Sequence, residues 1–190
     1  MSRRAWAAWG SLLAAAIICR VWVGAPIVIH TDGMVPAVVS GDLVWVSFGA
    51  AVPGDVVQAR MDEGESPQLA RVVAGPGSVV EVSAGVLYVD GQPLSRGASR
   101  IMQTCDGQRI RAIAETWGGD EVWVVGGADM APVRVPAGHV WLMGDNRPNA
   151  GDSQRWGAIA SELLDGVATH VIWSSKCDQA HWPTRPKRIR

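Results

Sequence analysis

The chain has 190 residues, of which 48% are hydrophobic and 18% charged, and its formal net charge is −1. This length suits one ordinary core or two small lobes and excludes a large multidomain protein, while the apolar content excludes an intrinsically disordered chain. The balance of 17 basic and 18 acidic residues gives no general electrostatic reason to expect nucleic-acid binding.

The first 29 residues form a distinct segment that is apolar and basic. Residues 5–19 are apolar or small apart from Ser11, and residues 21–29 continue this character after an arginine. At about 1.5 Å per residue, a helix over residues 5–29 could cross a hydrocarbon core of roughly 30 Å. Arg3 and Arg4 favour a cytoplasmic N-terminus. We therefore expect residues 1–29 to be an uncleaved single-pass anchor, with a cleaved secretory signal as the alternative.

Charge is distributed unevenly along the chain. Residues 1–29 carry +3 and residues 176–190 carry +4, which leaves −8 for residues 30–175 out of the total of −1. An acidic body between two basic ends is typical of a soluble domain tethered to a membrane. The basic tail, residues 176–190, ends in a stretch with four bases, residues 184–190, that either contacts anionic lipid headgroups or stays solvated.

The body of the chain reads as mainly β. Short runs rich in β-branched residues alternate with turns built from glycine, proline and aspartate, which is the spacing of an all-β barrel or coiled sheet. The expected strands are residues 43–48, 55–59, 70–73, 79–82, 86–89, 121–125 and 140–143. One helix is expected at residues 158–167. Residues 91–132 have weaker patterning, and we expect them to form a smaller inserted lobe.

Three cysteines are too few for a disulfide framework. Cys19 lies in the expected anchor, so only Cys105 and Cys177 could pair in an oxidising compartment, and three free thiols are the alternative. The sequence has no metal-ligand spacing and no nucleotide-binding loop between a strand and a helix. We therefore expect neither a metal nor a cofactor.

A series of motifs, read in order, resembles the type I signal peptidase family, the membrane-anchored serine proteases that remove signal peptides from exported proteins. The strongest block is residues 135–147, and the resemblance covers nearly the whole chain. The other matching blocks are residues 33–36, 40–42, 53–57, 71–77, 85–94, 152–153 and 156–157. The resemblance implies a signal-peptidase-like coiled β-sheet or barrel domain over residues 30–175, with the inserted lobe at about 91–132.

The resemblance also implies a catalytic serine beside a lysine that burial keeps neutral, and this chain lacks both. Gly33 stands where the family has the serine, and Ala70 where it has the lysine. Ala150 replaces a further serine that orients the lysine, and Gln154 replaces an arginine. Thr31 occupies the position of an oxyanion-stabilising hydroxyl in some members, but it is not placed to attack.

Other residues are weak candidates to restore catalysis. Asp32 could activate a water molecule, yet a single acid beside a turn is usually solvated. His30 and His139 are possible bases, but structural roles fit both better. Loss of a nucleophile and base that act as a unit typically costs about a million-fold in turnover. We expect a catalytically inactive member of the family.

Peptide binding does not need the serine or the lysine, because a peptide that adds to a sheet as a strand is held by main-chain hydrogen bonds. The residues expected to form the peptide-binding site or its scaffold are Met34, Pro36, Arg71, Asp145, Asn146, Arg147, Asp152 and Ser153. Among these, Arg71 and Asp145 are expected to form an ion pair. A retained fold without binding is the alternative interpretation of the same residues.

Three functional hypotheses follow. The first is an inactive relative at the outer face of a bacterial cytoplasmic membrane that binds signal peptides, exported proteins or a partner such as an active signal peptidase. The second is an active peptidase with a non-standard nucleophile and base. The third is a purely structural module. The expected partners also include the lipid bilayer and exclude nucleic acid.

Overall fold

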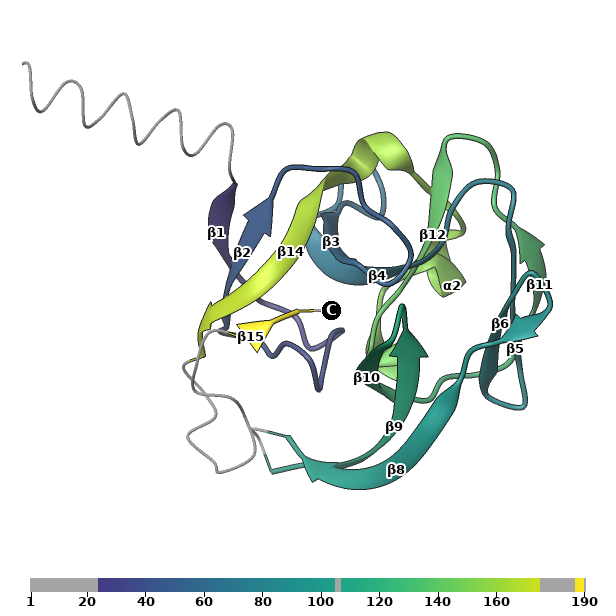
Figure 1. Ribbon diagram of the computed structural model, residues 1–190. Helices are drawn as coiled ribbons and strands as arrows, with labels where there is room; N and C mark the ends of the chain where they lie inside the picture. Colours follow the sequence, from purple (N-terminus) through teal and green to yellow (C-terminus); the bar gives the residue numbers. More distant parts are fainter. Residues whose placement is uncertain (1–23, 105–106, 175–186, 190) are drawn as a thin grey trace, which may run out of the picture.

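The computed structural model describes residues 24–104, 107–174 and 187–189 (Figure 1). Most of the expected anchor, all three cysteines and most of the basic tail lie outside these ranges, so the predictions made for them stay predictions. Within the described ranges, no helix combines the length and apolar character needed to cross a membrane.

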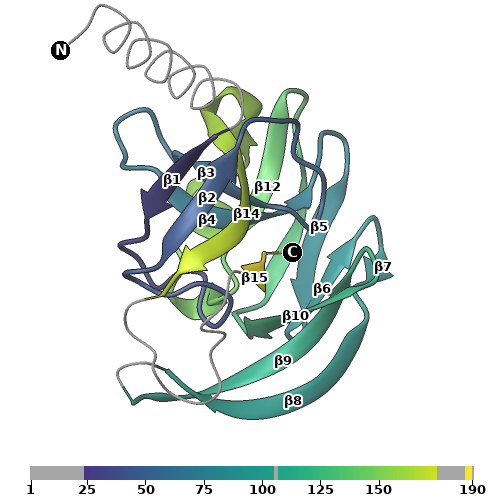
Figure 2. The ribbon, with the colours of Figure 1, turned by 60° about the vertical axis from the view of Figure 1, so that its left-hand side comes forward.

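The described chain is mainly β and consists of antiparallel sheets that curl around shared cores (Figures 1 and 2). In spatial order, the largest sheet contains β1 (Ala25–Val28), β2 (Leu43–Ser47), β14 (Leu164–Trp173), β3 (Val56–Ala59), β4 (Gln68–Ala74), β12 (His139–Met143) and β13 (Ile159–Ala160), with β15 (Lys187–Arg188) paired to β14.

Two smaller sheets lie between β4 and β12 in the sequence. One has the order β10 (Asp120–Val125), β9 (Arg109–Trp117) and β8 (Arg96–Gln103). The other has the order β11 (Met130–Arg134), β5 (Val79–Ser83), β6 (Val86–Val89) and β7 (Gln92–Pro93). Figure 2 shows β8 and β9 as a long curved ribbon at the end of the molecule opposite β1. The three-stranded sheet falls within residues 91–132, the range expected to form the inserted lobe.

Alternating side chains explain why these segments pair as strands. In β2, Val44 and Val46 are buried while their neighbours are partly exposed, as a strand with one face on a core requires. In β4, by contrast, six consecutive residues from Leu69 are buried, because this strand lies inside the sheet and is covered on both faces.

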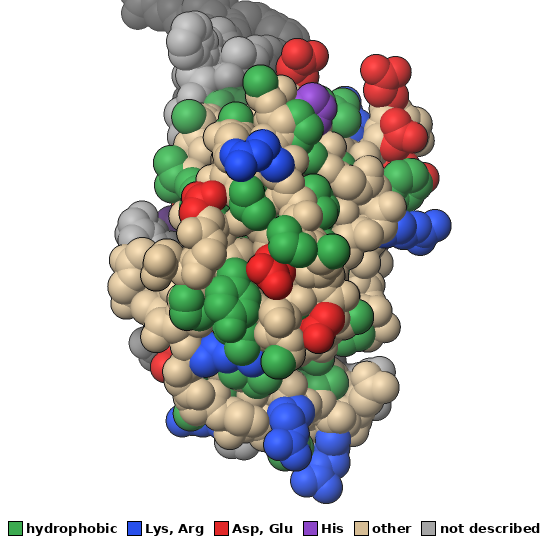
Figure 3. Space-filling view, turned by 90° about the vertical axis from the view of Figure 1, so that its right-hand side faces the viewer, with side chains coloured by type: hydrophobic (Ala, Val, Ile, Leu, Met, Phe, Trp, Pro, Cys, Tyr) green, Lys and Arg blue, Asp and Glu red, His purple; other side chains and the backbone are tan. Residues whose placement is uncertain are grey.

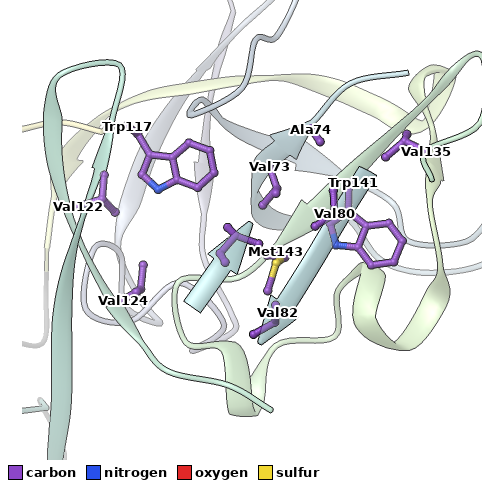
Figure 4. Close-up of a cluster of buried hydrophobic side chains, with 11 residues drawn as sticks. Val73, Ala74, Val80, Val82, Trp117, Val122, Val124, Val135, Trp141 and Met143 are labelled. Carbon is purple, nitrogen blue, oxygen red and sulfur yellow. The ribbon is translucent and has the colours of Figure 1, made fainter. Parts of the chain in front are cut away.

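One core cluster joins the three sheets (Figure 4). It contains Val73 from β4, Val80 from β5 and Val122 from β10, together with Trp117 at the end of β9 and Trp141 from β12. The inserted strands are therefore not packed as an independent unit, because they bury their apolar face against the main sheet.

All seven expected strands are present, with ends that differ by at most two residues. The helix expected at residues 158–167 is wrong. That stretch instead contains β13, a short 3-10 helix (Ser161–Leu163) and the start of β14, which pairs with β2 on one side and β3 on the other. Tertiary pairing on both edges prevails over the local helical pattern.

Two expected boundaries also need correction. Residues 25–28, counted as part of the anchor, form β1 and pair with β2. At the other end, Lys187 and Arg188 of the tail pair with β14 as β15. Ile189 is buried among the apolar side chains of the main sheet. The main chain of residues 187–188 and the side chain of Ile189 are therefore held by the fold.

Candidate functional site

The turn that carries Gly33 is the first component of the site. Asn146, from a distant segment of the chain, holds it in place through both its main chain and its side chain. The main-chain nitrogen of Asn146 donates to the carbonyl oxygen of Gly33 at 2.9 Å, and its side-chain nitrogen donates to the carbonyl oxygen of Asp32 at 3.0 Å. Gly33 itself is buried, whereas Thr31 and Asp32 are exposed. The position expected for the nucleophile is thus fixed by two hydrogen bonds from one residue.

Ala150 lies directly against this turn. A β-carbon placed on Gly33 would lie 3.8 Å from both the Cα and the Cβ of Ala150, which is ordinary van der Waals contact. A β-carbon placed on Gly144 would overlap the Cβ of Ala150 and lie 2.5 Å from the carbonyl oxygen of Gly33. Gly33 therefore lies beside Gly144 and Ala150, which come from one distant segment of the chain, and only a glycine fits at 144.

Ala70 belongs to β4, where it is paired with Val57 and only 1% exposed. Its side chain is part of an apolar cluster with Val57, Val72 and Leu142. Two residues earlier on the same strand, the side chain of Gln68 donates to the carbonyl oxygen of Gly151 at 3.0 Å. Because alternate residues of a strand share a face, this bond ties the Ala70 face of β4 to the segment that carries Ala150.

Arg71 and Asp145 form the ion pair expected from the sequence. The guanidinium of Arg71 donates to both carboxylate oxygens of Asp145, at 2.8 and 2.7 Å, and also to the carbonyl oxygen of Gly54 at 2.6 Å. Both side chains are buried. This bidentate pair joins β4 to the end of β12 directly beside the site.

Arg147 makes a second buried pair that the sequence did not predict. Its guanidinium donates to both carboxylate oxygens of Glu115, a residue of β9 with 0% exposure. Arg96 of β8 lies 3.7 Å from the same carboxylate. Arg147 therefore joins the segment after β12 to the three-stranded sheet. Because the sequence analysis expects no strand over residues 109–117, no local pattern marks Glu115 as a buried partner of Arg147.

Asp152 and Ser153 support the site through the backbone. The carboxylate of Asp152 accepts from the main-chain nitrogens of Gly144 and Gln154, each at 2.9 Å, and the second bond caps α2 (Ser153–Trp156). The hydroxyl of Ser153 accepts from the main-chain nitrogen of Leu142 at 2.9 Å. Burial raises the pKa of Asp152 above its ordinary value of 3.8, against the opposing effect of these bonds and of the positive charge of Arg147.

The remaining candidate residues take structural or exposed positions. Met34 and Pro36 are buried, and Met34 packs in the core of the main sheet. His30 is exposed, whereas the Nδ1 of His139 lies 2.9 Å from the carbonyl oxygen of Ala137. Among the described residues, no three His, Cys, Asp or Glu side chains are grouped so as to hold a metal ion.

The chain has clear relatives among known proteins. A "Probable signal peptidase I-1" of Synechocystis sp. is 30% identical over 169 residues, which cover 82% of this chain and 74% of that protein. A "Signal peptidase I" of Bacillus amyloliquefaciens is 25% identical over 175 residues, which cover 87% of this chain and 84% of that protein.

A crystal structure of a signal peptidase I from Enterococcus faecalis V583 also matches, with a TM-score of 0.44 and 19% sequence identity, over 64% of this chain and 98% of that one. The family model described as "Signal peptidase, peptidase S26" matches residues 2–173. On this match and the Synechocystis relative at 30% identity, the chain belongs to the peptidase S26 signal peptidase family.

Proposed function

We propose that this protein binds a signal peptide or another exported peptide in extended conformation at the outer face of the cytoplasmic membrane, and does not cleave it. The observation that carries this proposal is that a side chain at Gly33 would meet Ala150, at the positions where the resemblance places the family's nucleophile and lysine-orienting serine. Neither residue has a hydroxyl, and Ala70 has no amine. Acyl transfer by this family's chemistry needs the attacking oxygen and the base that deprotonates it.

The edge of β4 supports the binding part of the proposal. Within the described residues, β12 pairs with β4 only between Arg71 and Ala74, whereas β3 pairs with β4 from Gln68 to Arg71. Residues 68–70 therefore have one edge without a paired strand, directly beside the segment that carries Ala150. A peptide that adds there as a strand would be held by main-chain hydrogen bonds, which need no serine or lysine.

Cleavage of signal peptides by a non-standard nucleophile is the second candidate function. It is supported by the names of the two relatives described above, which are signal peptidases. The exposed His30, Thr31 and Asp32 lie immediately before Gly33 and are the nearest polar side chains in the sequence. This function requires one of them to replace the missing serine.

A cleavage assay on a pre-protein separates the two functions. We expect no product from the unmodified chain and measurable product from Gly33→Ser combined with Ala70→Lys and Ala150→Ser. The space at Gly33 admits a side chain in ordinary contact, and the apolar cluster around Ala70 would lower the pKa of a lysine amine there. Product from the unmodified chain at a rate near that of the triple variant would refute the inactive assignment.

Titration with a fluorescent signal-peptide segment then tests binding itself. We expect saturable binding to the unmodified chain. For comparison, Gln68→Ala removes the side-chain contact with Gly151 beside the open edge of β4, and should weaken binding. If neither protein binds the peptide saturably, only a structural role for the fold remains.

A further inference from the structure

The three-stranded sheet β8–β10 contains two kinds of charge. Most of β8 is exposed. Figure 3 draws the right-hand side of the molecule as seen in Figure 1, and Lys and Arg side chains lie at its lower end, at the height of β8 and β9 in Figure 1. Glu115 differs from these surface charges, because it has no solvent exposure and its carboxylate is bound by Arg147. A charge buried this completely must have a compensating partner, so Glu115 constrains where Arg147 can lie.

Arg147 is adjacent in sequence to the residue that holds the Gly33 turn. Asn146 makes both hydrogen bonds to that turn, one to the carbonyl oxygen of Asp32 and one to that of Gly33. A bidentate arginine–carboxylate pair fixes direction as well as distance. A shift of Glu115 on β9 would therefore move Arg147, and with it Asn146 and the Gly33 turn that Asn146 holds.

The end of β10 holds the same segment at two further points. The main-chain nitrogen of Val125 donates to the carbonyl oxygen of Asp145 at 2.7 Å, and Val125 forms an isolated parallel bridge with Asn146. Beyond β10, a β-carbon placed on Gly127 would lie 2.8 Å from the Cβ of Arg147. The backbone at Gly127 therefore packs against Arg147 as closely as a glycine permits.

We propose that Glu115 is a positioning residue through which the inserted three-stranded sheet sets the geometry of the Gly33 turn, and hence of the peptide site beside it. The first half of this inference concerns the turn alone, and the second half rests on the proposed peptide-binding function. The inserted sheet then acts as part of the binding site.

Hydrogen exchange of single backbone amides tests the first half directly, since the amide of Asn146 donates to Gly33. In the full chain in detergent micelles, Glu115→Gln should lower the protection factor of the Asn146 amide by about tenfold, a typical coupling magnitude. Amides in β2 and β3 should keep their protection. Loss confined to β8–β10, or equal loss throughout the chain, would overturn the proposal.

Two further variants distinguish a specific effect on the turn from general misfolding. Gly127→Ala leaves the ion pair intact but crowds the Cβ of Arg147, so it should also lower protection at Asn146. Arg60→Gln removes a half-exposed ion pair with Asp165, at 3.2 Å, and should leave Asn146 unchanged. If Gly127→Ala leaves Asn146 as protected as in the unmodified chain, the path from the inserted sheet to the turn does not exist.

Peptide affinity tests the second half. The dissociation constant of the fluorescent signal-peptide segment should rise about tenfold in Glu115→Gln and Gly127→Ala, and stay unchanged in Arg60→Gln. Unchanged affinity with reduced Asn146 protection would overturn the claim that the sheet positions the peptide site. If the unmodified chain binds no peptide, the proposed function fails, while the exchange data still decide whether Glu115 positions the turn.

Discussion

The buried charged residues Arg71, Asp145 and Asp152, here called the frame, differ in the role of their side chains from Gly33, Ala70 and Ala150, where the sequence resemblance predicts functional side chains in the family. Each of the three frame residues accepts or donates at least two hydrogen bonds, and each has at least one that joins it to another segment of the chain. A β-carbon on Gly33, in contrast, would make only van der Waals contact with Ala150. The frame is therefore needed for the fold whether or not the chain is an enzyme, and its presence carries no information about catalysis.

The strongest test of this comparison breaks the frame. Arg71→Met leaves the carboxylate of Asp145 buried without its bidentate partner and the carbonyl of Gly54 without a donor, so unfolding should be easier by about 3–5 kcal/mol. Urea denaturation measures this change. The matched control is Arg60→Met, which removes an exposed pair and should change stability by about 0–1 kcal/mol. Equal effects of the two substitutions would show that the Arg71 pair is not a structural element.

A second test compares two glycines at the same contact. Gly144→Ala forces a β-carbon against Ala150 and the carbonyl oxygen of Gly33, and should destabilise the fold by about 1–3 kcal/mol. Gly33→Ala meets only ordinary contacts at 3.8 Å and should change stability by less than about 0.5 kcal/mol. Thermal unfolding of both variants decides the matter. A costly Gly33→Ala would mean that glycine is required there by packing, and that the site has no room for a serine.

These differences explain how far the sequence alone could predict the molecule. Strands such as β2 and β6 were found because their apolar residues alternate and turns flank them. The pair Arg71–Asp145 followed from the family resemblance. The strand β14 was missed because its pairing on both edges depends on residues more than 100 positions away. Glu115 was missed for the same reason, since nothing near it in the sequence identifies Arg147 as its partner.

The smallest expected effect concerns Asp152. Its carboxylate accepts two hydrogen bonds from main-chain amides, but its burial disfavours the charged form. Its pKa is raised in the folded protein, so its contribution to stability is present at low pH and is lost as the pH rises from about 3.8 through the folded value. Asp152→Asn removes the titration and leaves the Gly144 amide facing a donor, so the variant should be less stable than the unmodified chain. Because only the unmodified chain loses the Asp152 contribution, the stability difference between the two should narrow from pH 4 to pH 7 in urea titrations. A difference that widens over this range would mean that hydrogen bonding to Gly144 and Gln154 outweighs burial, and that the folded pKa lies below the ordinary value.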